Sequence, residues 1–287
     1  MKKLRVLIIG SGNIGTDLLI KVLRSTKLQC AGFVGRSYSS KGMQKAASLG
    51  VRCSDRSVEF IINNQDDIDL VFDATSAKFH LESADIYKKL GIKVIDMTPA
   101  KLGELCVPSV NMSECSAHQN VNMITCGGQA SIPLAYALSK VYDDIEYIET
   151  VSSIASKSAG PATRANLDEY IATTEYGLKY FTGAQNAKAI LNLNPAIPCV
   201  NMQTTLLALV DPSKIEEFSA EVEAIVKEIQ LYVPGYELIV PPKYENGRVI
   251  TTVRVKGMGD YLPEYAGNLD IINCAAIAMA EEYANNE

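Results

Sequence analysis

The chain has 287 residues, of which 47% are hydrophobic and 21% are charged. This balance is typical of a globular protein with a substantial core, and the length suits one large domain or two ordinary ones. The net charge of -6 and the lack of a basic run interleaved with aromatic residues argue against a nucleic-acid partner. No stretch of about 18 apolar residues occurs, so we expect no membrane-spanning segment.

The cysteine and histidine content excludes two further classes of protein. The seven cysteines form no C-x-x-C pair, which argues against a disulfide scaffold. His80 and His118 are the two histidines, so we predict no metal site. The charged start Met1–Lys3 resembles that of a signal peptide, but the apolar run after it is short and ends in glycines. We therefore expect reduced thiols in a cytoplasmic protein.

The first 125 residues alternate between short apolar runs and segments with helical spacing of apolar residues. Such alternation predicts a parallel sheet with helices on both faces. In chain order, we expect a strand at 4–9, a helix at 16–24, a strand at 29–34, a helix at 42–49, a strand at 69–73, a helix at 79–90 and strands at 93–97 and 122–125. A helix then runs from Cys126 to about Val141.

The second half of the chain has longer strand patterns. We expect strands at 147–154, 187–193 and 202–210, and a hairpin of 236–240 with 249–255 about Asn246-Gly247. A helix is expected at 212–233, with one apolar face and one charged face. That charged face is either a docking surface or simply solvated. A last helix is expected at 268–283.

A glycine pattern follows the first strand. Gly10-Ser11-Gly12-Asn13-Ile14-Gly15 has the spacing G-x-G-x-x-G and opens a helix, which indicates dinucleotide binding. The first glycine makes the tight turn, the second lets the pyrophosphate approach the backbone, and the third packs the helix on the strand. The helix N-terminus offers unpaired N–H groups to the phosphates. The alternative is an ordinary tight turn between strand and helix.

The acidic residue that usually binds the ribose about 20 residues later is missing. Arg36, several serines and Lys41 follow the second strand instead. A guanidinium or an ammonium group pairs well with a 2′-phosphate, so both NAD and NADP are candidate cofactors and NADP is slightly favoured. The alternative is that Arg36 and Lys41 are loop charges facing solvent.

Cys126 lies between an apolar strand and an expected helix, and Gly127-Gly128 follows it. Backbone dipoles at a helix N-terminus stabilise a thiolate, so we expect the pKa of this thiol to be lowered. A fall of about 1.5 units would leave it half ionised near neutral pH. The glycines would let a substrate reach N–H donors that form an oxyanion hole. The alternative is a buried structural cysteine, as expected for the other six.

Five stretches, in order and across nearly the whole chain, match a known family. They are residues 9–18, 71–77, 120–130, 156–161 with 163–166, and 261–263 with 265–271. On these residues the chain resembles the acylating acetaldehyde dehydrogenases, the small type that associates with 4-hydroxy-2-oxopentanoate aldolase. The resemblance implies an α/β fold. It assigns 1–130 with 266–287 to a Rossmann-type dinucleotide-binding domain and 131–265 to an α+β dimerisation and catalytic domain, with the C-terminal helix returning to the first.

The resemblance also implies a mechanism. Cys126 would form an acyl thioester from a small aldehyde, with NAD or NADP taking the hydride, and coenzyme A would then accept the acyl group. A homodimer and an aldolase partner are implied as well. With the glycine pattern, the implied cofactor contacts are Gly10, Ser11, Gly12, Asn13, Ile14, Gly15, Ser158, Ala159, Gly160, Pro161, Ala162, Thr163, Arg164, Ala165, Asn166 and Asn268.

Two departures from the family lie in the second domain. Thr204 stands where the family carries an aspartate proposed as general base, and the connection 241–251 is shorter than usual. A threonine cannot take a proton near neutral pH, so we expect the acyl-enzyme to form faster than coenzyme A removes it. Asp168 and Glu169 are candidate substitutes, or else ordinary charges at a helix N-terminus.

Two other functions stay open at this point. A phosphorylating semialdehyde dehydrogenase shares the strand, cysteine and helix arrangement, but it usually needs a histidine base, and neither His80 nor His118 is well placed for one. A dinucleotide-binding structural or regulatory subunit of an aldolase complex is the third hypothesis.

Overall fold

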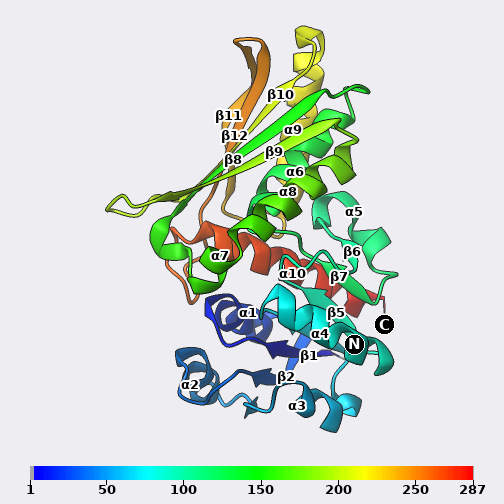
Figure 1. The fold of residues 1–287 in the computed structure, drawn as a ribbon, viewed down its shortest axis with the longest axis vertical. Coiled ribbons are helices and arrows are strands. Elements are labelled where there is room, and N and C mark those ends of the chain that lie inside the picture. Colours follow the sequence, from blue (N-terminus) through cyan, green and yellow to red (C-terminus); the bar gives the residue numbers. More distant parts are fainter. Residues whose placement is uncertain (1–2, 287) are drawn as a thin grey trace. The chain divides into compact units, whose positions relative to one another are not determined.

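The computed structural model describes residues 3–286, and the chain divides into two compact units, each with its own sheet (Figure 1). The first unit extends to Met123 and includes Asp260–Leu262 and the chain from Ile272 onward. The second unit comprises Ile124–Gly259 and Pro263–Ile271. The last helix, α10 (Gly267–Asn285), is therefore shared by both units.

The first unit contains a seven-stranded sheet with the order β3-β2-β1-β4-β5-β7-β6. Its strands are β1 (Leu4–Ile9), β2 (Leu28–Val34), β3 (Cys53–Ser54), β4 (Leu70–Asp73), β5 (Lys93–Asp96), β6 (Glu104–Leu105) and β7 (Asn120–Asn122). All the pairs formed by these strands are parallel, which confirms the predicted α/β fold. The strands β3 and β6 were not predicted, because two residues are too few to show a period.

Helices α1 to α5 belong to this unit. They are α1 (Asn13–Arg24), α2 (Lys41–Ser48), α3 (Ser57–Asn63), α4 (Ala77–Lys89) and α5 (Pro108–Cys115), with a 3-10 turn at Gln65–Asp67. The core packs Phe60 and Ile61 of α3 and Tyr87 of α4 with strand residues such as Val71 and Val94. Two of these helices were not predicted: α3 has only seven residues, and α5 is interrupted at Asn111, where φ is -141°.

The second unit contains a five-stranded mixed sheet with the order β11-β12-β10-β8-β9. Its strands are β8 (Tyr147–Ala155), β9 (Asn186–Asn194), β10 (Met202–Leu209), β11 (Tyr236–Glu245) and β12 (Arg248–Val255). The predicted hairpin about Asn246-Gly247 is confirmed, and both turn residues have positive φ. Strand β11 is longer than predicted and passes through Pro241 and Pro242, which an edge strand with irregular register tolerates.

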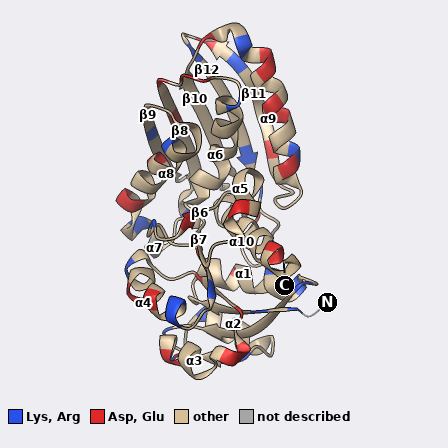
Figure 2. Cartoon of the chain, turned by 90° about the vertical axis from the view of Figure 1, so that its right-hand side faces the viewer, with Lys and Arg blue, Asp and Glu red and all other residues tan. Residues whose placement is uncertain are grey.

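The helices of this unit are α6 (Cys126–Ser139), α7 (Pro161–Ala165), α8 (Leu167–Thr182) and α9 (Ile215–Gln230), with 3-10 turns at Ser156–Ser158 and Pro212–Lys214. The predicted apolar face of α9 is confirmed, because Phe218, Val222 and Ile229 are buried, and Figure 2 shows charged residues along this helix. A helix start was expected here only as the alternative for Asp168 and Glu169, and no bounds were predicted for α8. Its buried face includes Thr173, Thr174 and Gly177, which give little hydrophobic periodicity.

Among residues 3–286, no helix combines the length and the apolar character needed to cross a membrane. The same residues contain no group of three or more histidine, cysteine or acidic side chains arranged to hold a metal ion.

Candidate functional site

The glycine loop of the first unit has the geometry that phosphate binding requires. Gly10 has φ +116°, and a Cβ placed there would lie 2.3 Å from the carbonyl oxygen of Ala74. A Cβ on Gly15 would lie 1.9 Å from the carbonyl oxygen of Gly10. A Cβ on Gly12 would meet no atom within 4 Å. Packing therefore requires the first and third glycines, and the second leaves an open approach to the backbone.

Helix α1 begins at the end of this loop. Gly12 is its N-cap and supplies no side-chain hydrogen bond, and the first turn contains no acidic residue. The N–H groups of a helix start without such a cap attract an anion. Strand β1, which leads into the loop, lies between β2 and β4 in the sheet. This is the point where the strand order reverses, the usual place for a ligand in such a sheet.

The loop after β2 packs on the glycine loop. Ser40 Oγ donates to Ser11 Oγ over 3.0 Å, and a Cβ on Gly35 would lie 2.5 Å from Ser11 Oγ. Arg36 directly follows Gly35 and is exposed, as is Lys41 at the first residue of α2. The segment therefore presents two cations and several hydroxyls, and no carboxylate, beside the glycine loop.

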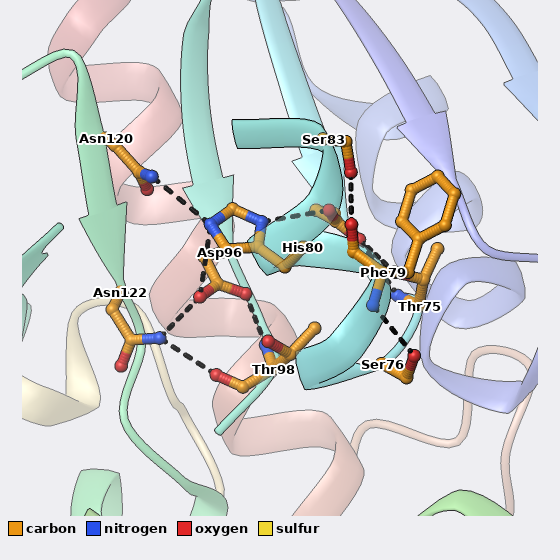
Figure 3. A network of polar contacts seen from close by, with 10 residues as sticks. Thr75, Ser76, Phe79, His80, Ser83, Asp96, Thr98, Asn120 and Asn122 are labelled. Atoms are coloured by element: carbon orange, nitrogen blue, oxygen red, sulfur yellow. Dashed lines mark hydrogen bonds and ion pairs between the residues drawn. The ribbon is translucent and has the colours of Figure 1, made fainter. Parts of the chain in front are cut away.

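A buried polar cluster in the first unit was not predicted (Figure 3). His80 of α4 lies between two carboxylates: its Nδ1 is 2.9 Å from Asp73 Oδ2 and its Nε2 is 3.5 Å from Asp96 Oδ2. The Nε2 atom is also 3.2 Å from Asn120 Nδ2. All three ionisable side chains have zero exposure. We call Asp73, His80 and Asp96 the acid–histidine cluster.

The two acids of this cluster end β4 and β5. Burial raises the pKa of Asp96 to about 7, against the opposing charge of His80 and hydrogen bonds from Thr98. Burial lowers the pKa of His80, but its hydrogen bond with Asp73 and the charges of both acids outweigh this effect, so the net pKa is raised. Both ring nitrogens are engaged, so His80 cannot serve a substrate as a base. His118, in contrast, is an exposed residue.

In the second unit, Cys126 is the first residue of α6, as predicted. The N-cap is Thr125, whose Oγ1 accepts a hydrogen bond from the N–H of Gly128 over 2.8 Å. Strand β7 ends at Asn122, three residues earlier than predicted, because Ile124 has φ 63° and the left-handed conformation cannot continue a strand.

The predicted lowering of the Cys126 pKa was wrong. Burial raises the pKa of this thiol to about 11. The hydrogen bond with Tyr170 and the N–H groups of Gly127 and Cys126 act in the opposite direction, and the N–H contribution is expected at a helix start. The side chain is only 9% exposed, and the loss of water outweighs these donors.

Three buried hydroxyl groups extend away from the sulfur of Cys126. Its Sγ donates to Tyr170 Oη on α8 over 3.7 Å, and Ser152 of β8 opposes the rise in the pKa of this tyrosine hydroxyl. Ser152 Oγ is 2.9 Å from Thr204 Oγ1, because these residues face each other in the antiparallel pair of β8 and β10. We call Tyr170, Ser152 and Thr204 the hydroxyl chain. Thr204 was predicted as a departure from the family, whereas no pattern in the sequence indicated Tyr170 or Ser152.

The predicted cofactor segment Ser158–Asn166 contains α7 and the turns on either side of it. Ser158 is buried and donates to the carbonyl of Ala155 over 2.8 Å. Arg164 holds its own segment, donating to the carbonyls of Ala159 and Ser156, each over 3.0 Å. The side chains of Pro161 and Ala162 lie outside what the structure describes.

Asn268 and the candidate acids have contrasting surroundings. Asn268 is 1% exposed, and its side-chain oxygen is buried without a hydrogen-bond partner in the described part of the chain. A buried acceptor of this kind fits an amide N–H such as that of a nicotinamide. Asp168 and Glu169 are exposed in the first turn of α8, as ordinary helix-start charges are.

Comparison with family models gives a match over most of the chain. Residues 5–118 match a family described as semialdehyde dehydrogenase, NAD-binding domain. Residues 126–263 match one described as prokaryotic acetaldehyde dehydrogenase, dimerisation.

Two curated relatives illustrate how similar the chain is to known acetaldehyde dehydrogenases. An acetaldehyde dehydrogenase from Spirochaeta aurantia is 60% identical, and the match covers 99% of this chain and 95% of the relative. One from Pectobacterium atrosepticum is 58% identical, with coverage of 98% and 95%.

Among solved structures, aspartate semialdehyde dehydrogenase with NADP from Candida albicans has a TM-score of 0.70 at 11% identity, covering 97% of this chain and 99% of that chain. Aspartate semialdehyde dehydrogenase II from Vibrio cholerae, complexed with ASA, has a TM-score of 0.66 at 15% identity, with coverage of 98% for both chains. These likenesses concern the fold.

Proposed function

Because the chain belongs to the acetaldehyde dehydrogenase family, we propose that it oxidises a short aldehyde with NAD or NADP and transfers the acyl group from a cysteine thioester to coenzyme A. The observation that carries the proposal is Cys126 at the first residue of α6, with its sulfur in hydrogen-bonding contact with Tyr170. Acetaldehyde is the first substrate to test, since the relatives are named for it.

The residues of the chain support each part of this reaction. The sulfur of Cys126, ionised by loss of its proton to water, adds to the aldehyde carbon, and the N–H groups at the start of α6 stabilise the oxygen that becomes negative. The bound nicotinamide supplies the acceptor for the hydride that leaves this carbon. The Cys126 thioester that remains is then attacked by the thiolate of coenzyme A, which releases the sulfur of Cys126.

The cofactor is assigned to groups that fit it. The loop Gly10–Gly15 and the start of α1 would hold the pyrophosphate, and Arg36 would meet a 2′-phosphate. The segment Ser158–Asn166 and the unpartnered oxygen of Asn268 would contact the rest of the dinucleotide. In this assignment, 1–130 with 266–287 binds the dinucleotide and 131–265 provides the substrate and dimer contacts.

Two partners follow from the family rather than from the site. The match of 126–263 to a dimerisation domain supports a homodimer. An aldolase of the 4-hydroxy-2-oxopentanoate type is the second proposed partner, because direct transfer would limit the escape of a small, reactive aldehyde. Light scattering of the chain, alone and mixed with such an aldolase, tests both proposals.

Loss of the Cys126 thiol is expected to abolish aldehyde oxidation. Wild-type protein mixed with acetaldehyde and NAD⁺ or NADP⁺, without coenzyme A, should release one reduced nicotinamide per subunit in a burst. Cys126→Ala should show no burst and no turnover, yet bind the dinucleotide as before, since the glycine loop belongs to the other unit. Cys199→Ala is the matched control, because it removes a half-buried thiol of the same unit. This variant should keep the burst and the turnover.

Four outcomes are informative about the candidate functions. Turnover with coenzyme A supports the proposal, whereas turnover with phosphate instead would identify a phosphorylating dehydrogenase. Retention of most activity by Cys126→Ala would remove this residue from the mechanism. A wild-type protein that binds dinucleotide but gives no burst would be a structural or regulatory subunit.

A further inference from the structure

We propose that Tyr170 is a catalytic residue that donates a hydrogen bond from its hydroxyl to the sulfur of Cys126, and that Ser152 and Thr204 position this hydroxyl. The inference rests on the proposed function in one respect, namely that Cys126 is the nucleophile. It adds to the site a residue from a different helix, α8. It also gives Thr204 a role in which the threonine does not act as a base.

The contact between the two helices is built by the local sequence. A Cβ on Gly127 would lie 2.1 Å from Tyr170 Oη, so the glycine after Cys126 provides the space that the tyrosine hydroxyl occupies. One turn later on α8, Thr174 Oγ1 is 2.8 Å from Oγ1 of the N-cap Thr125. The start of α6 is thus tied to α8 at two successive turns, and the Sγ to Oη distance of 3.7 Å is fixed by this packing.

The direction of the hydrogen bonds around the ionised sulfur follows from counting protons. Each hydroxyl has one proton to donate. Burial raises the pKa of Tyr170, and the Ser152 hydroxyl opposes this rise by donating to the tyrosine oxygen, which favours the anion. Ser152 then accepts from Thr204 across their 2.9 Å contact, and Tyr170 is left with its own proton for the sulfur. While Cys126 is a thiol, its S–H donates to Tyr170 Oη; once the sulfur is ionised it can only accept, so the three hydroxyl dipoles then turn toward it, and such chains strengthen each bond cooperatively.

The hydroxyl chain stabilises negative charge on sulfur without transferring a proton. When the thiolate attacks, a sulfur lone pair forms the C–S bond and the carbonyl π pair moves to oxygen, while Tyr170 keeps its proton. When coenzyme A later displaces Cys126, the C–S pair returns to sulfur and meets the same hydroxyl. A neutral donor serves both steps, whereas a carboxylate in contact with the sulfur would oppose its charge.

The test measures the reactivity of Cys126 directly, in the full-length protein without aldehyde, cofactor or coenzyme A. Iodoacetamide is the probe, and mass spectrometry of the Cys126 peptide gives the alkylation rate as a function of pH. Tyr170→Phe removes a single oxygen, and we expect alkylation near neutral pH to slow about ten- to a hundredfold, with the midpoint of the profile moved to higher pH.

Tyr236→Phe is the matched control. The hydroxyl of Tyr236 is buried and donates to the carbonyl of Ala130 on the same helix α6 over 2.7 Å, without contact to the sulfur. This variant should keep the wild-type rate and midpoint. Ser152→Ala should shift the profile in the same direction as Tyr170→Phe but less, because it acts through the tyrosine.

Two results would overturn the inference. One is a Tyr170→Phe profile that coincides with the wild type, and the other is equal slowing in Tyr236→Phe, which would indicate a general effect on α6. Neither affects the burst test of Cys126→Ala. Conversely, if Cys126→Ala retains aldehyde oxidation, the proposed function fails, and the alkylation profiles still report whether Tyr170 contacts the sulfur.

Discussion

The acid–histidine cluster of the first unit and the hydroxyl chain of the second are both buried polar networks, but they differ in charge. In the cluster, His80 has an acidic side chain beside each ring nitrogen, so all three members can carry charge (Figure 3). In the hydroxyl chain, Tyr170, Ser152 and Thr204 are neutral, and one end of the chain reaches a sulfur. The charged groups of the first network are paired with one another, whereas the second network ends at the reactive sulfur of Cys126.

The difference indicates two uses of buried polarity. A charge without water requires a partner in a fixed geometry, so the cluster holds the carboxyl ends of β4 and β5 together and tolerates little change. A neutral hydroxyl costs less to bury and can donate to whichever form of the sulfur is present. Removal of a residue should therefore affect mainly stability in the first network and mainly reactivity in the second.

The largest expected loss of stability comes from His80→Ala. Without the imidazole ring, the carboxylates of Asp73 and Asp96 stay buried with no cation between them, and breaking a buried ion pair typically costs about 3–5 kcal/mol. His118→Ala is the matched control and should leave the free energy of unfolding unchanged, because this histidine is exposed. Urea unfolding of the three proteins measures the difference, and equal stability of His80→Ala and wild type would contradict the paired-charge interpretation.

The next effect is a dependence of stability on pH. Burial raises the folded-state pKa of Asp96 to about 7. Burial alone would lower the pKa of His80, but the contacts with Asp73 and Asp96 raise it overall. In both cases the folded state binds protons more tightly than the unfolded state, so stability falls as pH rises. The loss of stability due to Asp96 runs from about pH 4 to above 7, and the loss due to His80 begins near pH 6.5.

Asp96→Asn isolates the carboxyl contribution to this slope. The amide oxygen can still accept from the N–H of Thr98, but the residue no longer titrates. Urea unfolding between pH 5 and 8 should show a shallower fall for the variant than for the wild type. The difference should reach a few kcal/mol over the range, because each tenfold difference in proton affinity between the folded and unfolded states corresponds to about 1.4 kcal/mol. Parallel curves would show that Asp96 does not take up a proton on folding.

Arg36 tests whether an exposed charge of the first unit can matter as much as a buried one. If its guanidinium meets a 2′-phosphate, Arg36→Ala should weaken NADP⁺ binding about ten- to a hundredfold and leave NAD⁺ binding nearly unchanged. Arg56→Ala removes another exposed arginine of the same unit and should alter neither NADP⁺ binding nor NAD⁺ binding. Dissociation constants by fluorescence titration measure both, and equal losses for the two cofactors would reduce Arg36 to a surface charge.

The parts of the fold that local sequence determines were predictable. The apolar runs of β1, β4 and β5 and the glycine loop depend on short-range patterns and on steric demands at Gly10 and Gly15, which the structure confirms. The position of Cys126 at the start of α6 followed from the same kind of pattern.

The parts that depend on distant packing were not predictable. The extent of helix α8 was not predicted because its buried face relies on threonine and glycine, and nothing indicated Tyr170 on it. Ser152 meets Thr204 only through the register of β8 and β10. The pKa of Cys126 was predicted in the wrong direction, because the helix start is visible in the sequence and the burial that outweighs it is not.

The smallest expected effects concern Thr204, at the far end of the hydroxyl chain. Thr204→Val keeps the branched shape in β10 and removes one buried hydroxyl, so the free energy of unfolding should fall by about 1 kcal/mol. The loss in Cys126 alkylation rate should be smaller than in Tyr170→Phe, because two hydroxyls intervene. A loss as large as that of Tyr170→Phe would show that the chain acts as one rigid unit.

Thr204→Asp asks whether the same position can serve as a base. A carboxyl in place of this threonine would have zero exposure, so burial would raise its pKa, and it would reach Cys126 only through Ser152 and Tyr170. We therefore expect the step with coenzyme A to quicken by much less than the roughly 10²–10⁴-fold of a positioned base. Single-turnover kinetics of acyl transfer measure the gain. It should disappear in the double variant Thr204→Asp, Tyr170→Phe, and a gain that persists there would mean that the carboxylate acts without the hydroxyl chain.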